Sequence, residues 1–222
     1  MKILITAGGT SEPIDQVRIL TNRSTGHTGA ELARLLRAQG HQITLLRATA
    51  AEAVPEIKQL LFDSFDSLDF TLQTLLAQEK FDLIIHAAAV SDYRLDHVEI
   101  NGKTVVGQLP KLPSGAPITL RLIPTHKIID RLLVYSQPHR PCVIGFKLTS
   151  HATEEQARQA AARVQADWVL HNETLDIQAG KRIFTVYRHG EKKQCLHGLP
   201  AVADWVNRLP VPNAKIPVGS SS

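Results

Sequence analysis

The sequence predicts an α/β protein with a mainly parallel, Rossmann-like sheet and helices on both faces. Short apolar runs typical of strands alternate with amphipathic runs typical of helices over most of the 222 residues, and this alternation indicates parallel strands joined by helical crossovers. Small or polar residues follow three of the apolar runs, at positions 7–10, 87–94 and 146–150. Ligands of such sheets bind beyond the carboxyl ends of the strands, so these three loops indicate where a site would lie.

The first half of the chain contains the clearest elements. They are strands at 3–6, 43–46 and 82–86 and helices at 28–39 and 68–78. Each strand is a short apolar run. In the first helix Leu32, Leu35 and Leu36 share one face, and Gly40 ends the pattern. Leucines repeat at the same helical spacing in the second helix.

The second half continues the alternation and ends in a hairpin. We expect strands at 118–123, 142–146 and 167–171, helices at 125–135, 153–165 and 201–208, and paired strands at 183–187 and 192–196. Apolar and polar residues alternate through 118–123, which is the period of a half-buried strand. The dipeptide His189-Gly190 separates the last two strands and favours a tight turn.

A segment between the two halves interrupts this pattern. It is rich in residues that end regular structure, namely Gly102, Gly107, Pro110, Pro113, Gly115 and Pro117. It predicts a long loop or flap at about 95–117 within a single domain of residues 1–209. Residues 210–222 are rich in proline, glycine and serine and are predicted to form a disordered tail.

The composition excludes several functional classes. The net charge of +4 is too small to indicate nucleic-acid binding but suits small anionic ligands. The two cysteines, Cys142 and Cys195, form no metal or redox motif, and the ten histidines show no metal-ligand spacing. The longest apolar run falls short of the roughly 18 residues of a membrane span, and the N-terminal run is too short for a signal peptide. We therefore expect a cytoplasmic protein that does not bind membranes.

Two glycine-containing segments are candidate phosphate sites. Gly8-Gly9-Thr10 follows the first strand, where glycines let backbone N–H groups approach a phosphate, although a tight turn needs the same residues. The segment 22–29 leads into the first helix, whose N-terminus attracts anions. Ser24 or Thr25 would cap this helix, and an ordinary capped helix start is the alternative. Asn22 stands beside it and could hold a carboxyl or phosphoryl oxygen.

The other candidates follow later strands or lie on the flap. The small residues at 87–89 would let a base or sugar lie against the backbone, and Asp92 could bind a ribose hydroxyl or a metal, or pair within its loop. Phe146 could stack on a base or pack in the core, and Lys147 could reach a phosphate. Lys103 and Lys111 on the flap could close over a triphosphate, although most loop lysines are solvated.

These motifs resemble those of the phosphopantothenate–cysteine ligases. The segments 3–18 and 21–26 are similar to the opening of that family, Ala87-Ala88-Ala89-Val90-Ser91-Asp92-Tyr93 to its second signature, and Gly145-Phe146-Lys147-Leu148 and the stretch 166–173 to its third and fourth. The resemblance covers about residues 2–208, with the motifs in the family's order. In many bacteria the ligase follows a flavin-dependent decarboxylase domain. Because nothing precedes Met1, we expect a stand-alone form without flavin.

The resemblance implies a two-step reaction. The carboxylate of 4′-phosphopantothenate attacks the α-phosphate of CTP with the help of Mg²⁺, giving an acyl-cytidylate and pyrophosphate. The amine of cysteine then displaces CMP and forms the amide of 4′-phosphopantothenoylcysteine, in coenzyme A biosynthesis. CTP is usual in bacterial members and ATP in eukaryotic ones. The family is typically dimeric, so a homodimer is expected.

The resemblance also implies roles for individual residues. Asn22 stabilises the acyl-nucleotide in the second step, and Lys111 serves the first step from the flap. The nucleotide pocket is formed by Ala88, Ala89, Asp92 and Phe146, with Gly9, Ser24 and Gly26 near the phosphates. Many members carry a second lysine near the flap lysine, where this chain has Leu112 and Pro113, and many read Gly-Phe-Ala-Ala-Glu-Thr where this chain has Gly145-Phe146-Lys147-Leu148-Thr149-Ser150. Lys147 is therefore a candidate for altering nucleotide choice, and no metal ligand is assigned.

Two other functions share the predicted fold. An NAD(P)-dependent reductase of the short-chain type needs a Tyr-x-x-x-Lys pair, but His97, His139 and Glu191 stand four residues after the three tyrosines. Its second strand would also end in an acid that binds ribose, where this chain has Leu46-Arg47. A non-catalytic nucleotide-binding protein is the second alternative, because a fold does not determine a function.

Overall fold

The computed structural model describes residues 1–105 and 111–210 and is built on an eight-stranded sheet. Its strands are β1 (Lys2–Ala7), β4 (Gln42–Ala48), β5 (Lys58–Phe62), β6 (Leu83–His86), β10 (Cys142–Thr149), β11 (Trp168–Glu173), β12 (Ile183–Arg188) and β13 (Glu191–His197). They lie in the order β13-β12-β11-β10-β6-β1-β4-β5. The six strands from β5 to β11 pair in parallel, and β12 and β13 are antiparallel. Counted along the chain, the parallel strands have the order of dinucleotide-binding sheets, which confirms the predicted fold class.

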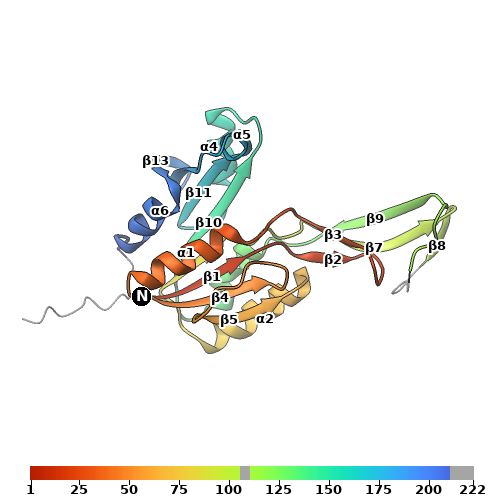
Figure 1. Ribbon diagram of the computed structural model, residues 1–222, viewed down its shortest axis with the longest axis horizontal. Coiled ribbons are helices and arrows are strands. Elements are labelled where there is room, and N and C mark those ends of the chain that lie inside the picture. Colours follow the sequence, from red (N-terminus) through yellow and green to blue (C-terminus); the bar gives the residue numbers. More distant parts are fainter. Residues whose placement is uncertain (106–110, 211–222) are drawn as a thin grey trace, which may run out of the picture.

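Helices cover both faces of this sheet, as predicted (Figure 1). The helices are α1 (His27–Ala38), α2 (Phe65–Gln78), α3 (Leu132–Tyr135), α4 (Glu154–Ala162), α5 (Thr174–Gln178) and α6 (Gly198–Asn207). Alternate residues of β1 point to opposite faces, so Ile3 and Ile5 pack with α1 and α6 whereas Leu4 packs with α2 and α3. Within the described residues no helix combines the length and apolar character needed to cross a membrane.

The helix α1 lies close to the sheet because a glycine faces β1. A Cβ atom added at Gly29 would lie 2.6 Å from the Cβ of Ala7, a separation that real side chains do not reach. Gly26 takes the N-cap position with a φ of 75°. The glycines at the start of this helix therefore set how closely it approaches the end of β1.

The predicted flap is largely β-structure, so the prediction of a loop at 95–117 was wrong for much of its length. β7 (Tyr93–Ile100), β8 (Lys103–Val105) and β9 (Ile118–Pro124) form an antiparallel sheet in the order β8-β7-β9. Figure 1 shows this sheet extending away from the main body beside a hairpin of β2 (Ser11–Pro13) and β3 (Ile19–Thr21). We call the five strands together the arm. In β7 the apolar residues Tyr93 and Leu95 precede, and Val98 and Ile100 follow, a bulge between Leu95 and His97, which interrupts the alternation by which strands are recognised.

Other differences from the sequence prediction are local. The helix expected at 125–135 starts with a 3-10 turn, Ile128–Arg131, because Thr125 instead bonds the 91–92 segment, its N–H to Asp92 O at 2.9 Å and its hydroxyl to Ser91 O at 2.8 Å. The strand β5, the hairpin β2–β3 and the short helix α5 were not predicted. The late hairpin is confirmed as β12 and β13, whose turn residues His189 and Gly190 have positive φ angles of 50° and 77°. The predicted disorder of the tail falls on 211–222, which lie outside the described residues, as do flap residues 106–110.

Candidate functional site

The centre of the candidate site is a backbone ridge between the ends of β1 and β6. The strand order reverses between these two strands, which makes their carboxyl ends the switch point where ligands bind. Gly9 and Ala89 form a parallel bridge there. The Ala89 N–H donates to Gly8 O at 2.8 Å, and the Thr10 N–H donates to Ala89 O at 3.2 Å. Two of the three predicted loops thus form one structure.

Glycine is required at this ridge because side chains would collide with neighbouring loops. Gly8 has a φ of 92°, and a Cβ there would lie 2.7 Å from the Cβ of Ala51. A Cβ at Gly26 would lie 2.6 Å from the same Ala51 atom, and one at Gly9 would lie 2.8 Å from Asn22 O. The glycines therefore allow the loops at this ridge to pack closely.

The first cavity, here called the glycine-rich cavity, has a volume of about 660 Å³. Four predicted site residues line it: Gly9, Asn22, Ser24 and Gly26. The first turn of α1 also lines it. Neither Ser24 nor Thr25 is the N-cap. That position belongs to Gly26, which has no side-chain cap, and Thr25 Oγ1 accepts only a long bond of 3.4 Å from the His27 N–H. The first-turn amides of α1 are therefore open to a bound anion.

The second cavity, here called the lysine-lined pocket, has a volume of about 340 Å³. Four other predicted residues line it: Ala88, Asp92, Phe146 and Lys147. Asp92 forms an ion pair with Lys127. The Phe146 ring packs edge to face on Phe184, with ring centroids 6.1 Å apart, so it also belongs to the core. The residues predicted to bind one nucleotide are thus divided between two cavities.

A hydrogen bond from Asn22 links the linings of the two cavities. Its side-chain Nδ2 donates to Val90 O at 3.0 Å and approaches Ala89 O at 3.5 Å. Asn22 lines the glycine-rich cavity, and Val90 lines the lysine-lined pocket. The catalytic role that the family resemblance implied for Asn22 stays a prediction.

The buried His86 supports the ridge through a contact with Thr6. Burial lowers the pKa of its imidazole to about 4, so the ring is neutral at physiological pH. His86 Nδ1 lies 2.9 Å from Thr6 Oγ1, and the same hydroxyl accepts the Ala88 N–H at 3.1 Å. These contacts fix the strand-end backbone on which Ala88 lies, so His86 has a structural role.

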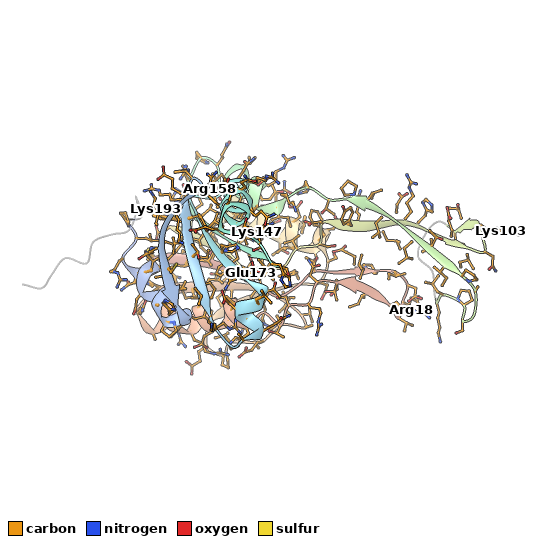
Figure 2. The ribbon with its side chains drawn as sticks, turned by 90° about the horizontal axis from the view of Figure 1, so that it is seen from above. Arg18, Lys103, Lys147, Arg158, Glu173 and Lys193 are labelled. Carbon is orange, nitrogen blue, oxygen red and sulfur yellow. The ribbon has the colours of Figure 1, made fainter. Side chains whose placement is uncertain are left out.

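The third predicted loop, after β10, is held by Glu173. The hydroxyl of Thr149 donates to its carboxylate at 2.6 Å, and the N–H groups of His151 and Thr174 donate at 2.6 and 3.2 Å. The bond from Thr149 is the largest cause of a lowered Glu173 pKa. Figure 2 shows Glu173 and Lys147 at the same end of the sheet. Glu173 therefore fixes the backbone beyond Lys147.

The chain matches a family model over residues 1–206, described as the DNA/pantothenate metabolism flavoprotein C-terminal domain. This match spans nearly all of the described structure. The chain belongs to this family. The family membership confirms the resemblance that the four motifs carried.

Individual relatives agree with this family assignment. A coenzyme A biosynthesis bifunctional protein CoaBC of Thermococcus kodakarensis is 33% identical over 177 residues, which are 77% of this chain and 41% of that protein. The Escherichia coli K12 protein of the same name is 28% identical over 175 residues, again 41% of its length. The chain thus spans about two-fifths of these curated relatives. A solved DNA/pantothenate metabolism flavoprotein from Streptococcus pneumoniae has a TM-score of 0.79 and 27% identity, and the match covers 93% of this chain and 96% of that one.

A solved Cab2 variant in complex with phosphopantothenate-cysteine shares the fold. Its TM-score is 0.67 at 18% identity, covering 92% of this chain and 87% of that one. At this level of identity the likeness concerns the fold alone.

Lys111, the predicted flap lysine of this family member, does not lie near Asn22. The N–H of the next residue, Leu112, donates to Asp15 Oδ2 at 2.8 Å. Asp15 lies in the turn at the outer end of the β2–β3 hairpin, whereas Asn22 follows β3 at its inner end. Figure 2 shows Arg18, from the same turn, out on the arm, with Lys103 farther out. Within one chain the two predicted catalytic residues are therefore separate.

Several cavity residues belong to none of the family motifs. Among them are Ile177 and Arg182 in the glycine-rich cavity and Lys127 and Arg163 in the lysine-lined pocket. Arg182 precedes β12, which runs antiparallel to β11. Such a strand begins at the edge where the parallel strands end, and this direction was the available signal. Within the described parts of the chain, no group of three or more His, Cys, Asp or Glu side chains is placed to hold a metal ion.

The contacts of Arg47, near the end of β4, do not favour the alternative of an NAD(P)-dependent reductase. In NADP-binding sheets an arginine near this point accommodates the ribose 2′-phosphate. Here the guanidinium of Arg47 donates to Gln59 Oε1 at 2.7 Å and to the carbonyl of Ala51 at 3.0 Å. Arg47 thus supports the loop against which Gly8 and Gly26 pack instead of facing a ligand.

The Asp15 contact predicts how the segment of Lys111 is held. Backbone N–H groups of Leu112, Val17 and Arg18 donate to Asp15, the Leu112 bond being the largest cause of a pKa well below the usual range. Asp15→Asn should speed amide hydrogen exchange at Leu112 by roughly tenfold or more, because bonds to a charged acceptor are stronger. Because the folded pKa is depressed, the wild-type protection should be full well above the unfolded value of about 4 and decline as the pH falls below it.

The control for this experiment is Asp96→Asn, in β7 of the same arm. Asp96 pairs with His97 and Arg121 at the surface and does not contact Leu112. Exchange at Leu112 that is the same in wild type and Asp15→Asn would show that the carboxylate does not hold this segment.

Proposed function

We propose that this chain is a ligase that joins 4′-phosphopantothenate and L-cysteine through an acyl-nucleotide intermediate, in coenzyme A biosynthesis. The observation that carries the proposal is the position of Asn22 between two cavities in a member of this family. A reaction between two anionic substrates needs two adjoining sites and a group that stabilises charge where they meet. The relatives are named for coenzyme A biosynthesis, which supports a role in the same pathway.

The proposed first step forms the intermediate. The carboxylate of 4′-phosphopantothenate attacks the α-phosphorus of a nucleoside triphosphate, the bond to the bridging oxygen breaks, and pyrophosphate leaves. The open amides and positive dipole end of α1 attract the phosphates. We assign Lys111 to this step, where an ammonium group would stabilise the charge that develops on the leaving pyrophosphate.

The proposed second step forms the amide. The amine of cysteine attacks the acyl carbon, the bond to the phosphate oxygen breaks, and the nucleoside monophosphate leaves. The attacking nitrogen loses its proton as the amide forms. The Asn22 amide group can stabilise the negative charge on the acyl oxygen while this happens. Its position is fixed by the carbonyl of Val90.

We propose CTP as the co-substrate in preference to ATP, with Mg²⁺. The described residues offer no preformed cluster of metal ligands, which fits a Mg²⁺ ion that arrives on the phosphates and takes one or two carboxylates from the protein. Asp92, exposed at the mouth of the lysine-lined pocket, is such a carboxylate. Bound there, the ion would neutralise phosphate charge. Lys147 would contact a phosphate from the same pocket.

A homodimer would resolve the separation of Lys111 from Asn22. The arm exposes apolar side chains, with Val17 67% and Ile19 55% exposed, and Tyr93 and Leu122 are also exposed. Apolar side chains on a projecting arm suit contact with a second copy. We propose that two chains pair through their arms and that this pairing carries Lys111 of one copy toward Asn22 of the other.

Multi-angle light scattering tests the dimer. Val17→Asp and Ile19→Asp together should convert a dimer to a monomer, because burying two carboxylates in an apolar interface is unfavourable. Leu61→Asp is the matched control, since Leu61 is also exposed, at 51%, but lies on β5 at the edge of the main sheet. A wild-type protein that is monomeric at micromolar concentration would refute the pairing.

A coupled pyrophosphate-release assay tests the function. Purified protein is incubated with 4′-phosphopantothenate, Mg²⁺ and either CTP or ATP, with and without cysteine. We expect pyrophosphate release with CTP and cysteine-dependent formation of CMP. No release with either nucleotide would favour the alternative of a non-catalytic nucleotide-binding protein. The observation that supports this alternative is that residues 147–150 differ from the family motif.

Two variants separate the proposed steps. Asn22→Ala should still release pyrophosphate but accumulate acyl-nucleotide, with product formation lowered by about a hundredfold or more, as for other oxyanion-stabilising amides. Lys111→Ala should slow pyrophosphate release itself. Lys193→Ala is the control, because Lys193 lies on β13 at the far edge of the main sheet and lines neither cavity. Rapid-quench kinetics measure each step, and wild-type product formation by both variants would overturn these assignments.

A further inference from the structure

The glycine-rich cavity has a wall that no sequence motif supplies. Ile177 and Arg182, from α5 and the start of β12, line it together with the first turn of α1. β12 is separated from β1 in the sheet by β11, β10 and β6. Arg182 therefore reaches the cavity from a part of the fold remote from the glycines.

The backbone of Arg182 is held in place, but its side chain is not neutralised. Its carbonyl accepts the Gly198 N–H at 2.7 Å, and Asn172 Nδ2 donates to the carbonyl of Ile183 at 3.2 Å. Arg140, by contrast, has a carboxylate partner, Asp167, at 2.8 Å. Across residues 1–105 and 111–210 no carboxylate lies within salt-bridge distance of Arg182. A fixed backbone thus presents an unpaired guanidinium at the cavity.

The cavity as a whole is suited to a polyanion. None of its lining residues is acidic, and it contains the guanidinium groups of Arg23 and Arg182. The third basic side chain, His27, already pairs with Glu52 at 3.2 Å. The N-terminus of α1 forms another part of the wall and has no acidic residue in its first turn. Positive groups therefore lie on two separate parts of the wall.

Because the positive groups lie on two parts of the wall, the cavity should bind a triphosphate more tightly than a single phosphate. One phosphate group bound at the amides of α1 satisfies one part of the wall and leaves the other unused. A chain of phosphates can contact the α1 amides and also reach a guanidinium, which binds phosphate oxygens in a bidentate manner.

We infer that Arg182 is a phosphate-binding residue that engages the phosphate chain of the nucleoside triphosphate while α1 binds its other end. This inference rests on the proposed function and extends it to a residue outside the family motifs. It also gives a physical reason for product release. Once pyrophosphate has left, the remaining monophosphate bridges the two parts of the wall less well and is held more weakly.

Calorimetric titration of the purified chain tests the inference, using CTP and CMP, and ATP and AMP. Arg182→Ala should weaken triphosphate binding by about tenfold or more, the range of a charge-assisted bidentate contact, and monophosphate binding by less than threefold. Arg182→Lys keeps the positive charge but loses the bidentate donors of the guanidinium, so the weakening of triphosphate binding should be intermediate. Arg208→Ala is the matched control, an exposed arginine at the end of α6 that does not line the cavity. Equal thermal unfolding midpoints ensure that folded proteins are compared.

The outcomes separate this inference from the proposed function. Unchanged triphosphate binding by Arg182→Ala overturns the inference, and so does an equal loss for tri- and monophosphates. If that occurs while the wild type forms 4′-phosphopantothenoylcysteine, the ligase function stands without the role of Arg182. A selective loss of triphosphate binding in a protein without turnover supports the inference and overturns the ligase function. A wild-type chain that binds none of the four nucleotides overturns both.

Discussion

The close contact between the loops after β1 and β6 is the constraint on which the rest of the site depends. Gly9 and Ala89 pair through their backbones, and Ala51 fills the space beside Gly8 and Gly26. A side chain at any of the three glycines would separate the loops, because the nearest atoms lie under 3 Å from its Cβ. The amides that face the glycine-rich cavity and the carbonyls that hold Asn22 both come from this contact. Small residues here therefore serve packing and ligand binding at once.

The sheet and the ridge could be predicted from sequence because both follow from local patterns. Apolar runs alternating with amphipathic ones define parallel strands, and the carboxyl ends of parallel strands must meet at one edge. Gly9, Ser24 and Ala88 therefore belonged to one region as soon as they were placed after strands or before a helix. A sequence pattern does not show on which face of the sheet each of these loops lies. The division of Gly9, Ser24 and Ala88 between two cavities was therefore not predictable.

The fold of the arm and the position of Lys111 depend on contacts between distant residues, which sequence patterns do not reveal. β9 was predicted from its alternation, but β7 pairs with it across an intervening segment and is interrupted by a bulge between Leu95 and His97. The position of Lys111 is set by a bond between Leu112 and Asp15, which are 97 residues apart. The position of Arg182 at the site was not predicted either, because it too depends on contacts between distant parts of the chain. Its strand was predicted, but its place at the site edge follows from the antiparallel direction of β12, which only the assembled sheet shows.

The neutral side chain of Asn22 suits a position between two anions. An arginine or lysine there would pair strongly with the substrate carboxylate before reaction and would stabilise the ground state as much as the transition state, which does not raise the rate of the chemical step. An amide donates a hydrogen bond without a net charge, so it gains most as negative charge concentrates on one oxygen. The charged groups line the two cavities, Arg182 and Arg23 in one and Lys147 and Arg163 in the other. In the proposed mechanism, charge would bind the substrates at the walls, and the dipole of the amide would act where bonds change.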